Sequence, residues 1–186
     1  LERRDRILSA VSTVAQTLVR NNEWEPIIPE CLELLGQAAR VEQVILLGMN
    51  FYGRAGFEEY YCEWTMSDIR DYLQVEPDVC SRIIPSVFWY LEKNRFYLGD
   101  SKAIRNELSL PEEEPVPSFL LLLPVFSSET LWGTLAFVTW RKEHTSPIAE
   151  IEALIMASEV IGSAISRFQT EELFHKPVER SLVGVY

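Results

Sequence analysis

The sequence contains few of the residues that usually bind metals or carry out acid–base catalysis. It has only two histidines, His144 and His175, and its three cysteines, Cys31, Cys62 and Cys80, form no Cys-x-x-Cys pair. A zinc site or a histidine-dependent active site must therefore use one of these two histidines. We predict no metal site and no resident cofactor. Scattered cysteines, odd in number, are typical of proteins from a reducing cytoplasm.

Basic residues and long apolar runs are also scarce. The chain has 17 Lys and Arg against 28 Asp and Glu, which gives a formal net charge of −11. This balance argues against binding of a nucleic-acid backbone or of an anionic membrane surface. No apolar run approaches the roughly 18–20 residues that span a bilayer, and the opening "LERRDRIL" does not have the pattern of a signal peptide. We therefore expect a cytoplasmic protein without nucleic-acid or membrane contacts.

The sequence motifs of common enzyme classes are missing as well. Neither phosphate-binding glycine pattern, G-x-x-x-x-G-K-[ST] or G-x-G-x-x-G, occurs, and the hydrolase pattern G-x-S-x-G is absent too. The phosphoacceptor and ATP-binding elements of a sensor kinase are missing, as is any cyclase motif. We predict that this stretch of chain is not itself an enzyme.

The residues that are present indicate a single domain with helices at both ends. The chain has 186 residues, of which 47% are apolar, so it can fill one core. Apolar residues at spacings of three and four predict a helix over residues 1–18 and a second helix from near Pro26. A last helix of about 30 residues is expected from a cap at Ser146 to a stop at Pro177, and a strand is expected to begin at Leu182.

Between these helices the apolar period falls to two, which indicates strands. Over residues 57–66, for example, Tyr60, Cys62, Trp64 and Met66 share one face. A short helix led by Pro85 is expected over residues 85–94. Strands are expected over residues 41–50, 57–66, 95–100, 118–126 and 131–140, the last two joined by a hairpin at Ser127 to Thr130. We predict an α+β fold, a mainly antiparallel sheet of five to six strands with helices packed on it.

The stretch "SFLLLLPVFSSETLWGTLAFVTW", followed by a helix that ends in "IGSAISRF", resembles the C-terminal half of a GAF domain. The resemblance covers roughly residues 20–172, and its best mark is Leu131-Trp132-Gly133 at the start of the last strand. Independently of the resemblance, Gly133 allows a close backbone approach and Trp132 offers a large packing surface. The resemblance implies a GAF-like (profilin-like) sheet with long helices at both ends.

The last residues, "VERSLVGVY", resemble the first strand of a PAS domain. GAF and PAS modules are often joined by long helices, so we predict a signalling helix over residues 1–20, a GAF domain over 21–172, and a linker with the start of a PAS domain over 173–186. The alternative is a native C-terminus whose tail packs back on the sheet.

The resemblance implies a regulatory sensor module from a bacterial or archaeal multidomain signalling protein, such as a sensor histidine kinase or a diguanylate cyclase. Such a module binds a small ligand and passes a conformational signal through its terminal helices. Two alternatives are a ligand-free module that only dimerises and relays movement, and the regulatory region of a transcription factor. A third is a free methionine sulfoxide reductase, which uses a set of cysteines.

The expected ligand site follows from the position of the pocket in GAF domains, between the sheet and the irregular elements, here residues 67–118. We expect six side chains to line it: Trp64, Met66, Phe88, Trp89, Tyr97 and Asp100. A mainly apolar pocket with a few polar groups fits an unidentified small, partly aromatic metabolite. Bilin attachment is disfavoured because Cys80 is followed by Ser81 instead of histidine, and the cyclic-nucleotide signature cannot be traced in order. The apolar seam of residues 1–18 also predicts a homodimer formed through the terminal helices.

Overall fold

The computed structural model describes residues 2–50, 57–70, 79–142 and 150–183. Its centre is a five-stranded antiparallel sheet of order β2-β1-β5-β4-β3. The strands are β1 (Gln43–Asn50), β2 (Phe57–Thr65), β3 (Tyr97–Asp100), β4 (Phe119–Ser127) and β5 (Thr130–Thr139). Each of these strands lies within two residues of a stretch where alternation predicted one, so the α+β class is confirmed.

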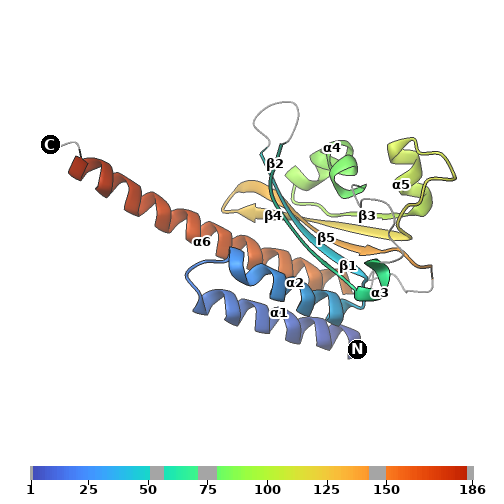
Figure 1. Cartoon of the computed structure of the whole chain (residues 1–186), viewed down its shortest axis with the longest axis horizontal. Helices are drawn as coiled ribbons and strands as arrows, with labels where there is room; N and C mark the ends of the chain where they lie inside the picture. Colours follow the sequence, from blue (N-terminus) through green and yellow to red (C-terminus); the bar gives the residue numbers. More distant parts are fainter. Residues whose placement is uncertain (1, 51–56, 71–78, 143–149, 184–186) are drawn as a thin grey trace.

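Helices cover both faces of the sheet (Figure 1). One face carries α1 (Glu2–Arg20), α2 (Ile28–Ala39) and α6 (Ile151–Val183), and the other carries α4 (Val79–Glu92) and α5 (Ser101–Leu108). A 3-10 turn (Glu25–Ile27) precedes α2, and the single turn α3 (Ser67–Arg70) follows β2. Within the described parts of the chain, none of these helices combines the length and apolar character that a bilayer-spanning segment needs.

The core is therefore split into two apolar layers, one on each side of the sheet. The layer under α1, α2 and α6 includes Val14, Leu32, Leu46, Phe137 and Ile161. The layer under α4 and α5 includes Ile45, Ile83, Val87, Ile104 and Leu122. Period-two alternation in β1, β4 and β5 supplies both layers, because successive side chains point to opposite faces of a strand.

The apolar seam of α1 is used mainly within the chain. Ile7, Val11, Val14 and Leu18 are almost fully buried, and α1 packs on both α2 and α6. The spacing of three and four correctly predicted an amphipathic helix, but the same pattern serves an intrachain layer as well as a partner chain. The buried half of this seam is therefore not a free dimer surface.

Helix α4 begins earlier than predicted and includes Pro85 in its interior. The expectation that Pro85 leads a helix over 85–94 is thus wrong. Val79, Ile83, Val87 and Leu91 are buried at helical spacing against the sheet, and this packing outweighs the hydrogen bond that proline cannot donate. The sequence did not predict helix α5. Asp100 caps its N-terminus, because the Oδ1 atom of Asp100 accepts a 2.9 Å hydrogen bond from the amide of Ala103.

Helix α6 continues past Pro177 to Val183 and projects beyond the sheet (Figure 1). Both the predicted stop at Pro177 and the predicted strand from Leu182 are therefore wrong. A helix satisfies its backbone groups internally, whereas a strand needs a partner, and none of the described strands pairs with this segment. The PAS domain predicted for residues 173–186 thus does not appear as a strand at 182–183. The predicted cap at Ser146 lies outside the described residues.

Strand β3 is short and leaves part of β4 at the edge of the sheet. It pairs only with the first half of β4, from Asp100 opposite Phe119 to Tyr97 opposite Leu122. Strand β4 goes on to Ser127, paired with β5 alone among the described strands. Pro124 lies in this edge, which is where a sheet tolerates a residue without an N–H group.

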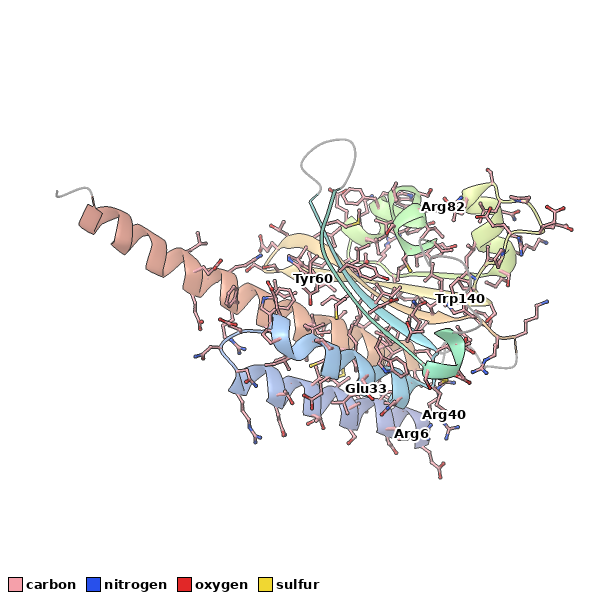
Figure 2. The ribbon with its side chains drawn as sticks, in the orientation of Figure 1. Arg6, Glu33, Arg40, Tyr60, Arg82 and Trp140 are labelled. Carbon is pink, nitrogen blue, oxygen red and sulfur yellow. The ribbon has the colours of Figure 1, made fainter. Side chains whose placement is uncertain are left out.

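The predicted role of Gly133 is confirmed. A β-carbon at this position in β5 would overlap the carbonyl oxygen of Leu47 in β1. Trp132, next to it, packs edge-on against Trp24, with ring centroids 5.5 Å apart, and is tilted against Tyr60 at 5.9 Å. Tyr60 is labelled on β2 in Figure 2. The Leu131-Trp132-Gly133 segment thus packs the start of β5 closely against β1 and against Trp24 in the layer under α2.

Candidate functional site

Two of the six predicted ligand residues do not lie where the sequence placed them. Trp64 shares a face of β2 with Tyr60 and Cys62, as expected, but this face is covered by α2 and not by α4. A β-carbon at Gly36 of α2 would overlap the Trp64 ring, so the ring lies directly on that helix. Met66 lies just after β2, where its sulfur accepts a 3.7 Å hydrogen bond from Nη2 of Arg141.

The other four predicted residues lie on or near the α4 side of the sheet, each in different surroundings. Trp89 is 49% exposed on α4 and stacks on Tyr90 with ring centroids 3.7 Å apart. Tyr97 packs against the α4 layer, and Asp100 is occupied as the cap of α5. Phe88 is half-buried and lines a groove beside the β4–β5 hairpin. The six side chains therefore do not all lie on one side of the sheet.

Tyr97 carries a polar group on this side of the sheet. Its hydroxyl is buried and makes no hydrogen bond with any described residue. Burial raises the pKa of this phenol, and the carboxylates of Glu107 and Asp100 raise it further. The Tyr97 hydroxyl therefore stays protonated and can donate a hydrogen bond beside the apolar layer under α4. Part of the region in which a pocket was expected, residues 71–78, lies outside the described residues.

Cys31 and Cys62 do not have the properties of reactive thiols. Burial, followed by the charge of Glu30, raises the pKa of the Cys31 thiol to about 11. Burial also raises the pKa of Cys62, although the hydrogen bond with Tyr60 partly offsets this. A thiol that attacks a sulfoxide needs a lowered pKa, because the thiolate is the nucleophile. This arrangement does not favour the reductase alternative.

A charged cluster closes the end of the sheet farthest from the hairpin. Glu42 is fully buried, and its Oε1 accepts a 2.7 Å hydrogen bond from Nε of Arg141. Its Oε2 accepts from the amides of Trp140 at 2.8 Å and Arg141 at 3.2 Å. Arg141 also reaches Asp68 of α3, with Nη1 3.1 Å from Oδ2. Figure 2 labels Trp140 at this end. Across the described ranges, no group of three or more acidic, cysteine or histidine side chains is arranged to hold a metal.

The arrangement with the clearest functional geometry is the contact between the β4–β5 hairpin and α6, which we call the hairpin–helix junction. At its centre is Gly162 of α6, where a β-carbon would overlap the carbonyl oxygen of Phe126 in β4. The hydroxyl of Ser127 donates to Oε1 of Gln169. The hydroxyls of Ser128 and Ser166 are 2.8 Å apart and share a hydrogen bond.

This junction joins the sheet to the helix that leaves the domain. It contains a close backbone approach at Gly162 and two polar bonds one and two turns farther along α6, so a displacement of the hairpin acts on α6 along more than one turn. Sequence analysis predicted the hairpin but not its contact with α6. The available signal was Gly162 itself, since a glycine inside a helix destabilises it by about 1 kcal/mol relative to alanine and usually has a packing reason.

Two grooves flank the junction, one on each side of the hairpin. The first, of about 670 Å³, runs between α6 and the open edge of β4, and the residues before β3 close its outer side. The second, of about 630 Å³, lies between the hairpin, the end of α4 and α6 and includes Phe88. Phe126, Ser128, Glu129 and Ser166 line both grooves. Each volume is within the range of about 300–1,000 Å³ that small-molecule sites occupy.

Comparison with known proteins supports this description of the fold. No family model matches the chain. Over 180 residues the chain is 28% identical to the methanogenesis regulatory histidine kinase FilI of Methanothrix harundinacea (strain 6Ac); the match covers 91% of this chain and 20% of that protein. The chain thus spans about a fifth of the relative's length.

Solved structures share the fold at low sequence identity. The phycocyanobilin-bound GAF domain of a cyanobacterial phytochrome superposes with a TM-score of 0.64 at 16% identity, covering 88% of this chain and 95% of that one. The GAF domain of a protein described as a sensor histidine kinase from Pseudomonas syringae pv. tomato gives 0.57 at 14% identity, covering 92% and 94%. Free methionine-R-sulfoxide reductase from Neisseria meningitidis gives 0.60 at 10% identity, covering 92% and 95%. The five-stranded antiparallel sheet between two helical layers is therefore the fold of a GAF domain.

Proposed function

We propose that the chain is a regulatory sensor module of a signal-transduction protein. In this proposal the module binds a small ligand and passes a conformational change along α6 to an output domain such as a histidine kinase. We place it in the cytoplasm, a reducing compartment in which Cys31 and Cys62 stay reduced thiols, as they are in the structure. The likeness to part of FilI, a regulatory histidine kinase, supports the kind of output domain.

The observation that carries the proposal is the hairpin–helix junction. Ligand binding shifts a conformational equilibrium only if the ligand binds two states with different affinity. The junction offers a route for such a difference to reach α6, because the grooves beside it share residues with both the hairpin and the helix. Beyond Thr170 the helix runs on to Val183, so a rotation or shift at the junction is carried away from the sheet.

The test is the rotational phase of α6 in the full-length protein. Inserting four residues after Thr170 turns the following helix by about 40° beyond one full turn, whereas seven residues nearly restore the phase. We expect the four-residue insertion to disturb output control and the seven-residue insertion to preserve it largely. Equal tolerance of both insertions means that α6 is a tether, and the relay proposal fails.

A second candidate is a ligand-free module that dimerises and relays movement, and one surface favours it. Between α1 and α6 lies a shallow groove of about 360 Å³ lined by Ala15, Val19, Met156 and Val160 among others. Val19 is 68% exposed and Met156 is 46% exposed, so an apolar strip of both terminal helices is uncovered in a single chain. Two copies joined along this strip bury it, as in a helical bundle.

Light scattering at micromolar concentration tests this second candidate. We expect about twice the chain mass of 21.5 kDa. Replacing Met156 with Glu should give a folded monomer, because this side chain faces solvent in the single chain. Val11, which is 4% exposed, is unsuitable for the test because Glu at that position disrupts the core of the monomer. A monomeric parent chain refutes dimerisation.

A further inference from the structure

The first groove beside the junction, which we call the edge groove, exists because β3 begins only at Tyr97. Directly before it, helix α4 is ended by Asn94, which has a left-handed backbone with φ 56°, and by the amide of Arg95, which donates to the carbonyl of Tyr90. The residues that a longer β3 would place beside Leu123 to Val125 therefore do not pair with β4. The space between them and α6 is the edge groove, of about 670 Å³.

The floor of the edge groove is apolar and partly aromatic. Phe96, Pro124, Phe126 and Ile155 line it, and the Phe96 side chain is 42% exposed, so its ring is open to a ligand. Pro124 has no N–H group to donate, so this edge is poorly suited to receiving an added peptide strand. The geometry favours a compact ligand with an apolar part that covers the Phe96 ring.

The charged groups of the edge groove are unbalanced. Glu129 on the hairpin and Glu159 on α6 both line it, and neither carboxylate has an ion pair with a described residue. Arg167, also in the lining, has Nη2 donating a 2.8 Å hydrogen bond to the carbonyl of Leu18 near the end of α1. This contact places the positive charge at a helix C-terminus, where it is stabilised. In the lining, two carboxylates outnumber the single guanidinium, so the groove as a whole favours a cationic ligand over an anionic one.

The polar groups that remain present negative or partly negative oxygen atoms to an ammonium cation. Ser158 is 3% exposed and lines the groove, and its hydroxyl donates to the carbonyl of Ile155 at 2.7 Å, so its oxygen is left as an acceptor. A cation over an aromatic ring gains about 0.5–2 kcal/mol, more as water is excluded. Carboxylates, a hydroxyl oxygen and aromatic rings line one cavity, and these are the groups that stabilise an organic ammonium cation.

We propose that the edge groove binds a small organic ammonium compound, whose cation lies between Glu159, Glu129 and the Phe96 ring. This inference rests on the proposed sensor function, since the ligand would contact both the hairpin and α6 at the junction. The site is separate from the α4 layer where the sequence placed the ligand. Binding of the cation there changes the packing of the segment of α6 that the hairpin holds.

Choline and its uncharged isostere 3,3-dimethylbutan-1-ol are suitable probes for the 186-residue chain. Both are titrated to millimolar concentration at constant ionic strength, and amide shifts are followed by NMR. We expect choline to give saturable shifts at Phe96, Ser158 and Glu159, and the alcohol to bind at least about five-fold more weakly, as a cation–π and carboxylate site predicts. Shifts of equal size and saturation with both probes, or no saturable shifts with choline, overturn the proposal.

Variants locate the binding and separate it from folding. Glu159→Gln and Phe96→Leu should each weaken choline binding about five-fold or more. Glu152→Gln, which removes an exposed carboxylate of α6 outside the groove, should leave binding unchanged. The side chains of Glu159 and Phe96 are both exposed, and circular dichroism checks the fold of each variant. If Glu152→Gln weakens binding as much as Glu159→Gln does, choline responds only to the overall negative charge and the site is refuted.

The insertion experiment in α6 distinguishes this inference from the proposed function. If choline fails to bind while the four-residue insertion still disturbs output, the sensor proposal stands and the edge-groove inference falls. If choline binds as described while both insertions are tolerated, the site stands and the relay through α6 falls.

Discussion

Replacing Gly162 with Val tests whether the hairpin–helix junction holds α6 against the sheet. Because a β-carbon at this position overlaps the carbonyl oxygen of Phe126, the substitution cannot be accommodated by a change of side-chain rotamer. Carbon–oxygen contacts settle near 3.4 Å, so the helix and the hairpin must separate by about 1 Å. That separation also stretches the bond between Ser128 and Ser166.

The expected free energy follows from two opposing contributions. Val has a somewhat better helix propensity than Gly, which stabilises the variant by a few tenths of a kcal/mol. Overpacking at a close backbone contact costs about 1–3 kcal/mol. We therefore expect Gly162→Val to lower the free energy of unfolding by about 1–3 kcal/mol, measured by urea denaturation.

Ser163→Val is the matched control for this substitution. It introduces the same side chain at the adjacent residue of α6, which is exposed, and serine and valine have similar helix propensities. Its free energy of unfolding should stay within about 0.5 kcal/mol of the parent value. If the two variants are equally stable, Gly162 does not mark a close contact and the junction does not constrain α6.

Two further predictions concern other parts of the fold. Arg141→Met removes the cation that pairs with the buried carboxylate of Glu42, so it should lower the free energy of unfolding by about 3 kcal/mol. This is the lower end of the range for a broken buried pair, because water reaches Arg141. Arg82→Met removes only the exposed pair with Glu114 and should lower the free energy of unfolding by less than about 1 kcal/mol; equal losses in the two variants contradict this reasoning. The thiol of Cys31 has a pKa of about 11 in the folded chain against 9.0 for a free thiol, so the unfolded chain loses its proton first, and Cys31 should lower the free energy of unfolding by about 2 kcal/mol as pH rises from 9 to 11. Burial also raises the pKa values of Tyr60, Cys62 and Tyr97, so Cys31→Ala should still lose stability over this pH range, but by about 2 kcal/mol less than the parent chain in urea denaturation. An identical decline in the variant and the parent assigns the whole effect to these other groups.

The sequence predicted the strands well because alternation is a local property. In β2 the alternation placed Tyr60, Cys62 and Trp64 on one face, and they do share one. Alternation does not say which helical layer covers that face. The sequence therefore predicted Trp64 on the ligand-binding side, whereas in the structure its ring packs on Gly36 of α2. The same limit applies to α1, whose apolar seam gave no sign of whether its partner was α6 or a second chain.

The site was harder to predict because it depends on contacts between distant segments. Ser127 and Ser128 were identified as hairpin residues, but their partners Gln169 and Ser166 lie about forty residues later. In α4, Pro85 was taken as a helix start because proline suits a first turn, while the buried spacing of Val79 and Ile83 was overlooked. Local rules failed where tertiary packing outweighed the preference of a single residue.

The late start of β3 also affects how the molecule contacts other chains. The second half of β4 is a strand edge, and such edges pair readily with strands of other molecules and promote aggregation. Here Pro124 interrupts the row of donors, and the hairpin and α6 occupy the space on one side. The chain can therefore keep an unpaired strand beside its exit helix, and so keep that cavity accessible, without offering a template for intermolecular sheet growth.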